Sequence, residues 1–537
     1  MATMGRSKGS AGAMRSVESG PANDGPRSRR AIALSVAVTT AASAAILGTP
    51  SARAERWSID ASVSSQLMWT SNGDLGLGVS GQSDSVLDVR PRISLRGEGA
   101  RLRISGSAGL DAVTSAHGTQ PSRVLPQADL NARLEAVERL LFLEAAVRAM
   151  QTSQNVFGLR PESGSTQNAL TTSLVRFSPY IEASAGPDLR YRLRSDNSWT
   201  SERTSTNSPA ASLASGRFGR HSVMLEHDPR PLGWRVEAER AETRYDDPLR
   251  EPLVLDVARA SVDYAIGQDF SAGVRAGHER TSFTTLNPNT TIYGLQAKWQ
   301  PSSRTTLTAF EEKRFFGRAW RLSFDHRMPR LAWNVALSRS LNTTPQTLAD
   351  LPPTDNVAAL LDAMFTTRFP DPTERARVVQ DYMASQGLPT STLSPITLYS
   401  QRLSIVTLRS ARVVLTGARN SLALSAFQSR SEDALDAGPL ATGDPAANNT
   451  QYGAALAWSQ RMSKTVGVAA GVDWSRITSL RPVTPERTIQ HSASLRITIQ
   501  AAPKTSAFLG ARYRKLESNV VPSGRDGAVT VGLEHRF

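Results

Sequence analysis

Hydrophobic and polar residues alternate along most of the chain, most clearly in the last ten residues, 528–537. One face of this segment is apolar apart from a single histidine and carries Val529, Val531, Leu533, His535 and Phe537. The other face carries Ala528, Thr530, Gly532, Glu534 and Arg536. A two-residue period predicts a β-strand, and about ten residues suffice for a tilted strand to cross a bilayer. We interpret this segment as a transmembrane strand with its apolar face towards lipid.

The same period recurs along the chain, with residues 489–499 as the clearest further example. Counted from Trp57, it predicts about 22 strands, with a range of about 18 to 24 because the signal of a single strand is weak. An even number places both ends of the chain on the same side, as closure of an antiparallel barrel requires. The predicted strands lie near residues 56–69, 84–96, 100–113, 127–135, 139–152, 173–184, 188–202, 217–227, 233–244, 256–266, 269–280, 289–299, 303–312, 318–326, 331–342, 400–416, 420–430, 450–460, 465–476, 488–500, 505–515 and 527–537.

Short turns alternate with long polar loops between these strands. Turns such as 186–188 and 501–504 contrast with loops such as 153–171 and 431–449. Short periplasmic turns and long outer loops are typical of outer-membrane barrels, and closure is favoured because an open sheet edge in lipid leaves backbone groups unpaired. We therefore predict an all-β fold, a transmembrane antiparallel outer-membrane β-barrel. The alternative fold, a soluble all-β solenoid, requires regular repeats, which we do not find in the sequence.

One insertion, residues 354–387, has a helical rather than a two-residue period. Its first half carries an apolar stripe formed by Val357, Leu360, Leu361, Met364 and Phe365. A second helix is predicted from the cap at Asp371, with Pro372 at its first position, to Gly387. Strand parity places the insertion on the long-loop, outward side. Because both apolar stripes need burial, the pair either enters the barrel mouth or interior and restricts passage, or caps the rim or docks a partner.

Residues 1–54 are predicted to be a signal peptide, and residues 55–537 the barrel. Arg27, Arg29 and Arg30 precede an apolar run at 31–47, and Ala52-Arg53-Ala54 provides the small-x-small pattern of a signal-peptidase site. An uncleaved transmembrane anchor is the alternative. Residues 55–537 contain no run of about eighteen apolar residues that would predict a transmembrane helix. Together with the strand pattern, the signal predicts export through the periplasm to the cell outer membrane.

Charge and cysteine content argue against several classes of function. The chain has 62 basic and 48 acidic residues, a net charge of +14, and no cysteine. Almost all the basic residues are arginines spread singly along alternating segments, so they do not indicate nucleic-acid binding, which favours clustered patches. The absence of cysteine excludes a disulfide scaffold and a Cys-ligated metal site. Without residues 1–54 the chain keeps 55 basic and 46 acidic residues, a net charge of +9.

No motif indicates catalysis, and we predict no enzyme activity, no cofactor and no metal. Residues 76–81 match GxGxxG, but a polar loop and another strand follow, where a dinucleotide fold needs a helix. The seven histidines lack the spacing of metal ligands, and neither a GxSxG elbow nor a P-loop is present. A surface hydrolase with a non-contiguous Ser/His/acid set is the remaining enzymatic alternative.

Eight arginines share the parity of polar residues within their strands: Arg101, Arg103, Arg190, Arg192, Arg194, Arg496, Arg512 and Arg514. An arginine that faces lipid at the bilayer midplane costs about 2–4 kcal/mol, so we expect these side chains to face the lumen. They are candidate contacts for an anionic solute, because guanidinium groups match carboxylate and phosphate. In the alternative, they pair with lumenal acids such as Glu237, Glu239, Asp473 and Glu534.

Five further segments point to a known family: residues 92–110 (RISLRGEGARLRISGSAGL), 178–180 (SPY), 189–200 (LRYRLRSDNSWT), 370–389 (PDPTERARVVQDYMASQGLP) and 415–427 (LTGARNSLALSAF). They resemble the outer-membrane β-barrel family associated with PEP-CTERM/exosortase systems and exopolysaccharide loci. The resemblance implies an outer-membrane location and a polysaccharide or protein-sorting context, but no reaction. The last strand also resembles the terminal strand of bacterial outer-membrane barrels, in which the final Phe is part of the assembly signal. His535 departs from that pattern, because an apolar or aromatic residue is usual there.

We therefore expect an integral outer-membrane barrel linked to exopolysaccharide export or PEP-CTERM protein sorting, as a channel or surface component with a basic lumen. A general solute porin and a non-conducting assembly or anchoring partner are the alternatives. The expected partners are outer-membrane lipid, the barrel-assembly machinery through the strand ending at Phe537, and anionic polysaccharide or export-system proteins. No nucleic acid is expected.

Overall fold

A computed structural model describes residues 56–76, 81–161, 168–203, 215–246, 251–282, 289–350, 356–386, 388–389, 392–396, 403–434, 448–480 and 485–537. The predicted signal peptide, 1–54, lies outside the described residues. The strands form one antiparallel sheet in which each strand pairs with its neighbours in sequence, and β1 pairs with β22. The prediction of a closed antiparallel barrel is confirmed, with 22 strands.

The strands are β1 (Arg56–Thr70), β2 (Asp84–Glu98), β3 (Leu102–Ser115), β4 (Arg123–Val137), β5 (Leu141–Ser153), β6 (Ala169–Ala185), β7 (Leu189–Arg203), β8 (Ser215–His227), β9 (Leu232–Tyr245), β10 (Leu253–Ile266), β11 (Phe270–Thr281), β12 (Asn289–Ser302), β13 (Thr305–Arg314), β14 (Gly317–Arg327), β15 (Leu331–Thr343), β16 (Leu403–Thr416), β17 (Asn420–Asp433), β18 (Asn449–Arg461), β19 (Val466–Ser479), β20 (Arg487–Ala502), β21 (Thr505–Ser518) and β22 (Gly524–Arg536). The described helices all lie between β15 and β16: α2 (Thr344–Asp350), α3 (Asn356–Phe365) and α4 (Pro372–Gln386). None of these helices is long and apolar enough to span a membrane.

The C-terminal strand closes the barrel and has the two faces predicted for it. In the register of β1 with β22, Trp69 pairs with Val529. The backbone N–H of Phe537 also donates to the carbonyl of Ala61 at 2.9 Å. On the outer face Val529 is 48 % exposed and Phe537 is 67 % exposed, whereas the inward-facing Ala528 is only 4 % exposed.

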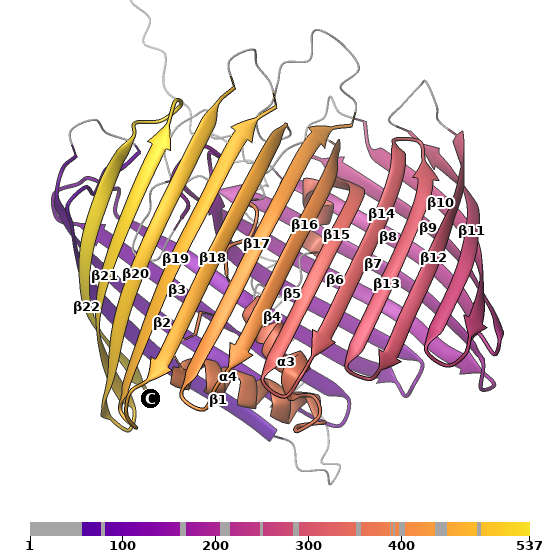
Figure 1. Ribbon diagram of the computed structural model, residues 1–537, viewed down its shortest axis with the longest axis horizontal. Coiled ribbons are helices and arrows are strands. Elements are labelled where there is room, and N and C mark those ends of the chain that lie inside the picture. Colours follow the sequence, from indigo (N-terminus) through magenta and orange to yellow (C-terminus); the bar gives the residue numbers. More distant parts are fainter. Residues whose placement is uncertain are drawn as a thin grey trace, which may run out of the picture. The chain divides into compact units, whose positions relative to one another are not determined.

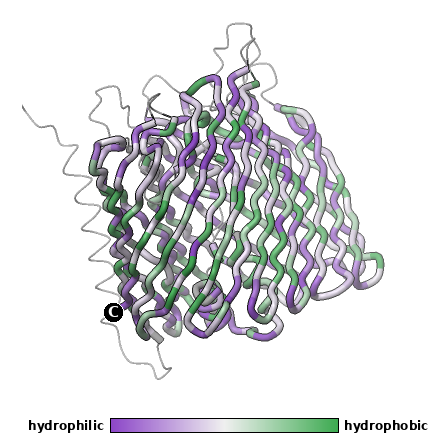
Figure 2. Tube along the Cα trace, turned by 60° about the vertical axis from the view of Figure 1, so that its left-hand side comes forward, coloured by the Kyte–Doolittle hydropathy of each residue, from purple (hydrophilic) through white to green (hydrophobic). Residues whose placement is uncertain are grey.

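Apolar side chains cover the outer face of the barrel. Ile59, Leu295 and Val274 are among the most exposed large hydrophobic side chains, and all point outward. Hydropathy alternates residue by residue along the strands in Figure 2, because neighbouring residues face opposite sides of the wall. A continuous exposed apolar surface of this size indicates contact with lipid rather than with water. The fold is thus an all-β barrel of the outer-membrane type.

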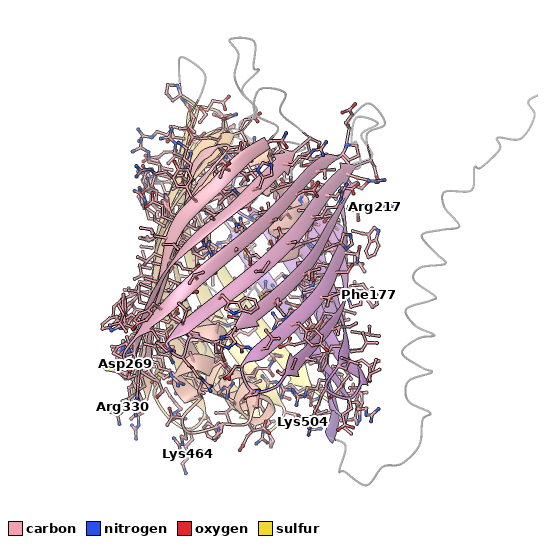
Figure 3. All side chains as sticks on the ribbon, turned by 90° about the vertical axis from the view of Figure 1, so that its right-hand side faces the viewer. Phe177, Arg217, Asp269, Arg330, Lys464 and Lys504 are labelled. Carbon is pink, nitrogen blue, oxygen red and sulfur yellow. The ribbon has the colours of Figure 1, made fainter. Side chains whose placement is uncertain are left out.

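The two ends of the barrel differ as the sequence predicts. At one end the strands are joined by short turns, in two of which Gly186 and Gly267 adopt positive φ angles of 75° and 73°, a conformation glycine takes without strain. Figure 3 shows Arg330, Lys464 and Lys504 at this short-turn end. At the other end most connections are longer, and both chain ends of the barrel lie at the short-turn end, as an even strand number requires.

The two predicted helices of the insertion are present, and they lie inside the barrel. Their connection leaves β15 and enters β16 at the long-loop end, but α3 and α4 lie near the short-turn end, the same end as the C-terminus (Figure 1). They contact the inward-facing Ala332, Val414 and Ala423, all near short turns. The outward position predicted for the insertion is therefore wrong for the helices themselves, because strand parity determines only where a connection begins and ends.

Candidate functional site in the barrel interior

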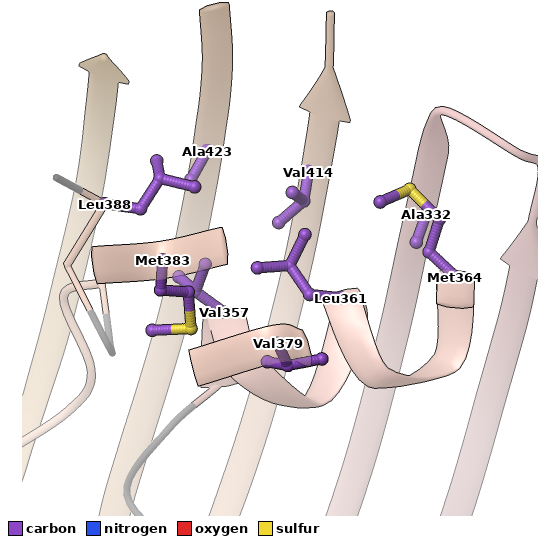
Figure 4. Packing of buried hydrophobic residues seen from close by; sticks show 9 residues of the cluster. All are labelled: Ala332, Val357, Leu361, Met364, Val379, Met383, Leu388, Val414 and Ala423. Carbon is purple, nitrogen blue, oxygen red and sulfur yellow. The ribbon is translucent and has the colours of Figure 1, made fainter. Parts of the chain in front are cut away.

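An apolar cluster fixes α3 and α4 to the inner wall. Leu361 is fully buried and packs with Val357 and Met364 from the same helix, Val379 and Met383 from α4, and wall residues of β15–β17 (Figure 4). The stripe that repeats every three or four residues in the sequence is thus the face that meets the wall. The second helix begins as predicted, since the Asp371 carboxylate accepts a hydrogen bond from the Glu374 backbone N–H at 3.0 Å.

Polar contacts tie the same helices to widely separated strands. Arg327 of β14 donates to the carbonyl of Ala363 at 2.9 Å, near the C-terminal end of α3. The Tyr382 hydroxyl lies 2.7 Å from that of Ser421 on β17. Arg96 of β2 forms a hydrogen bond with Gln380 of α4. The helix pair therefore extends from the wall at β14–β17 towards β2 and occupies part of the short-turn mouth.

Two irregular segments occupy the lumen next to β18–β22. Phe157 and Leu159, in the connection between β5 and β6, are each 2 % exposed. The Phe157 carbonyl accepts a hydrogen bond from Thr488 at 2.9 Å. After α4 the chain passes Ile396, whose backbone N–H and carbonyl both bond to the side chain of Gln451, at 2.8 and 2.9 Å. These contacts fill the side of the lumen opposite to β7–β14.

Arg160 joins these two segments. Its guanidinium donates to the carbonyl of Ser394 at 2.8 Å, and its backbone N–H donates to Gln490 at 3.3 Å. Burial lowers the pKa of Arg160 to about 10, and the negative charge of Asp473 opposes part of that shift. The group stays protonated at neutral pH, so it contributes a fixed positive charge.

Helix α2 crosses the interior near the long-loop end. Asp350 at its end accepts two hydrogen bonds from Arg220 of β8, at 3.0 and 2.7 Å, and Arg176 of β6 donates to the Ala349 carbonyl at 3.1 Å. Ala349 also packs against Phe218. A polar cavity of about 190 Å³ lies among these residues and is also lined by Arg194. The helix thus covers the inner wall of β6–β8.

A large cavity of the interior lies along β7–β14 near the short turns. It measures about 1090 Å³ and is lined by inward-facing polar residues and by the turns after β8 and β10. Four acids line it, Glu226, Asp228, Asp263 and Asp269, against six cations, Arg190, Arg230, Arg235, Arg275, Lys298 and Arg321. We call this cavity the basic vestibule. Because Asp188 and Glu312 pair with Arg230 and Arg275 from outside this lining, its attraction for anions comes from the cations that remain unpaired.

Lys298 and Arg321 differ from the other four cations of the basic vestibule, each of which has an acidic partner. Most lumenal arginines are neutralised by an acid, as Arg190 is by Asp228 at 2.6 Å. Among the described residues, neither Lys298 nor Arg321 forms an ion pair. An unpaired cation on a wet wall attracts mobile anions, whereas a paired one contributes little field.

Seven of the eight arginines predicted from parity have an acid within 4 Å. The pairs are Arg101–Glu138 (3.8 Å), Arg103–Glu98 (3.5 Å), Arg190–Asp228 (2.6 Å), Arg192–Glu182 (2.7 Å), Arg194–Glu144 (2.8 Å), Arg512–Asp526 (3.0 Å) and Arg514–Asp526 (2.9 Å). Arg496 instead stacks at 3.6 Å over the ring of Phe508. Arg101 lies in the turn before β3 rather than within a strand. The eight side chains form separate groups on β3, β7 and β20–β21 and do not converge.

The two unpaired cations of the basic vestibule were not among the eight arginines chosen from strand parity, although both have the parity of lumen-facing residues. Arg321 alternates with Trp320 and Leu322, and Lys298 alternates with Trp299, so both have the parity of polar residues. No local sequence pattern shows that the neighbouring strands place no acid next to Lys298 or Arg321. Among the described residues, no group of three or more His, Asp or Glu side chains is arranged to hold a metal ion.

Comparison with models of known families and with curated proteins finds no match. Among solved structures, the FrpB iron transporter from Neisseria meningitidis matches with a TM-score of 0.47 and 8 % identity, over 89 % of this chain and 81 % of that chain. The siderophore receptor PirA from Acinetobacter baumannii matches with 0.45 and 8 %, over 89 % and 80 %. Pseudomonas aeruginosa OccK5 (OpdH) matches with 0.28 and 8 %, over 89 % and 98 %. These similarities are low, so the fold is defined by its own strand pairing.

Proposed function

We propose that the protein is an integral outer-membrane barrel that provides a restricted, basic passage in exopolysaccharide export or PEP-CTERM protein sorting. The apolar outer face and the polar lumen support the location. The sequence resemblance of segments such as 92–110 and 370–389 supports the cellular context. In this proposal the chain reaches the outer membrane through the periplasm, and the strand ending at Phe537 is recognised by the barrel-assembly machinery. We assign it no catalytic role.

The basic vestibule is the observation that carries the proposed passage. It lies on the side of the lumen that the inserted segments leave open, and two of its cations, Lys298 and Arg321, have no acidic partner among the described residues. A wall of this kind raises the local concentration of anions, and an acidic polysaccharide is a chain of such anions. The path continues towards the smaller cavity through the inner face of β7, which lines both cavities with Arg190 and Arg194.

The inserted helices argue against a general solute porin as the first choice. A barrel with an unobstructed lumen passes small solutes freely, whereas α3 and α4 pack against the inner wall at the short-turn mouth. The same feature favours a second candidate, a non-conducting assembly or anchoring partner. The exposed Arg377 and Asp381 of α4 would then contact a periplasmic protein.

Deletion of the gene in its host tests the proposal. We expect surface polysaccharide, measured by composition analysis of washed cells, to fall, and we expect the parent gene to restore it. A variant with Lys298→Glu and Arg321→Glu should restore less, although its heat-modifiable band on a detergent gel is as strong as that of the parent. Unchanged surface polysaccharide, together with unchanged surface display of PEP-CTERM proteins, would refute the proposed role.

A further inference from the structure

The outer face of the barrel carries a cluster of cations whose side chains point away from the lumen. Arg217 of β8, Arg240 and Arg244 of β9, and Arg280 of β11 are exposed, and their neighbours in sequence face the interior. We call these four residues the outer arginine cluster. Arg217 lies near the long-loop end of the wall (Figure 3). Because this face otherwise meets lipid, the cluster marks where the apolar surface ends.

The outer arginine cluster is only partly neutralised by the protein. Arg217 and Arg244 are directly opposite one another in the register of β8 with β9, an arrangement that like charges disfavour. Arg244 pairs with Glu242, and Arg240 pairs with Asp256 at 3.4 Å. Among the described residues, Arg217 and Arg280 form no ion pair, although Asp256 is directly opposite Arg280 in the register of β10 with β11, so the four arginines outnumber the acids Glu242 and Asp256 by two. Two positive charges therefore remain for an external anion.

An apolar groove lies directly next to this cluster. It measures about 700 Å³, and its floor is formed by Ala238 and Ala258, which are flanked by the larger Leu193 and Val223. Arg240 and Arg280 line the edge nearest the long loops. The strand register explains this shape. Val223, Ala238 and Ala258 are directly opposite one another on β8, β9 and β10. This row lies two residues nearer the short turns than Arg240, and its two alanines leave a depression beside the arginine. The groove and the cluster thus form one amphiphilic site.

The position of the site identifies the chemistry of its ligand. An outward-facing arginine costs about 2–4 kcal/mol at the midplane of a bilayer but only about 0–1 kcal/mol near the interface, so the cluster belongs at the interface. The long-loop end faces the outer leaflet in the proposed orientation. Arginine forks bind phosphate through charge-assisted hydrogen bonds, and the groove beside them suits a hydrocarbon chain.

We propose that β8–β11 bind one molecule of a phosphorylated, multiply acylated glycolipid of the outer leaflet. A phosphate contacts the outer arginine cluster, and an acyl chain lies in the groove. This site depends on the outer-membrane location but on no particular transported solute. It can therefore exist whether or not the lumen conducts.

Native mass spectrometry of the purified full-length barrel in detergent tests the phosphate contact. The probe is lipid A with two phosphates, and dephosphorylated lipid A and phosphatidylglycerol are compared with it. We expect the variant with Arg240→Gln and Arg280→Gln to retain at least about tenfold less lipid A than the parent. Arg430→Gln is the matched control, since Arg430 is also an exposed strand arginine, paired with Glu432 at 2.7 Å. It should bind like the parent.

A second pair of substitutions tests the groove without touching the charges. Ala238→Leu and Ala258→Leu fill the floor from the outer face, where no inward packing is disturbed, and should weaken binding of lipid A but not of its deacylated phosphosugar. Equal binding of lipid A by the parent and the arginine variant would overturn the proposal. Binding of phosphatidylglycerol as tight as that of lipid A would also overturn it, since the site would then be a general anionic contact.

Discussion

Lys298 and Arg321 are the residues on which the selectivity of the proposed passage depends. Elsewhere in the lumen a single carboxylate neutralises two arginines, as buried Asp526 does for Arg512 and Arg514, at 3.0 and 2.9 Å. Such networks hold neighbouring strands together and leave little field for a solute. The two unpaired cations of the basic vestibule project their charge into the cavity instead.

Neutralising these two residues is expected to lower anion selectivity. A unit charge about 4 Å away contributes about 1 kcal/mol even in water, which corresponds to about a fivefold change in local anion concentration. The variant with Lys298→Gln and Arg321→Gln should therefore show a several-fold smaller anion-to-cation permeability ratio, measured from the reversal potential in planar bilayers under a salt gradient. The charge-preserving variant, Lys298→Arg with Arg321→Lys, serves as the control. An unchanged reversal potential would exclude these residues from the conducting path.

At the scale of single residues, the sequence indicates on which face of a strand a side chain lies, but not which side chain it pairs with. Arg514 has the parity of a lumenal residue because lipid and lumen act on alternate positions of any strand that crosses the membrane. Its partner Asp526 lies on the next strand, and the 2.9 Å contact depends on the register between β21 and β22. That register involves distant parts of the chain, so no local pattern specifies which arginines are left without an acid.

At the level of elements, the burial of their apolar side chains, and not the end of the barrel at which their connection begins, determines where the inserted helices lie. Their apolar stripe needs a surface, and the inner wall offers small inward-facing residues, Ala332 and Ala423, which are buried in one cluster with Leu361. The helices were predictable because capping and helical periodicity are local. Their place at the short-turn end was not, because it depends on a wall assembled from β15, β16 and β17.

Substitution of Leu361 by Asp tests this packing. Placing a carboxylate in an apolar contact without a partner costs several kcal/mol, so the helix pair should detach from the wall. We expect trypsin to cleave at Arg368, in the exposed segment between the helices, faster than in the parent. Ala359→Asp introduces the same charge at an exposed position of the same helix and should leave the cleavage rate unchanged. Equal cleavage rates in all three proteins would show that the cluster does not hold the helices.

At the scale of the whole molecule, the strands of the barrel wall and the segments inside the lumen are specified by different features of the sequence. The wall is specified by a two-residue period that any short window reveals, which is why the number of strands was predictable. The contents of the lumen are specified by contacts between segments far apart in sequence, such as Thr488 with Phe157. The result is a barrel filled on one side and open along β7–β14.

The single-channel conductance of a barrel without the insertion tests this account most directly. Residues 354–387 are replaced by a short Gly/Ser loop, and the parent and the variant are compared in planar lipid bilayers after both are shown to give a heat-modifiable band. Because α3 and α4 occupy part of the short-turn mouth, the variant should conduct severalfold more than the parent and should sensitise cells to large antibiotics. A folded variant that conducts no more than the parent would contradict the restricted passage and would favour a docking role for the helices.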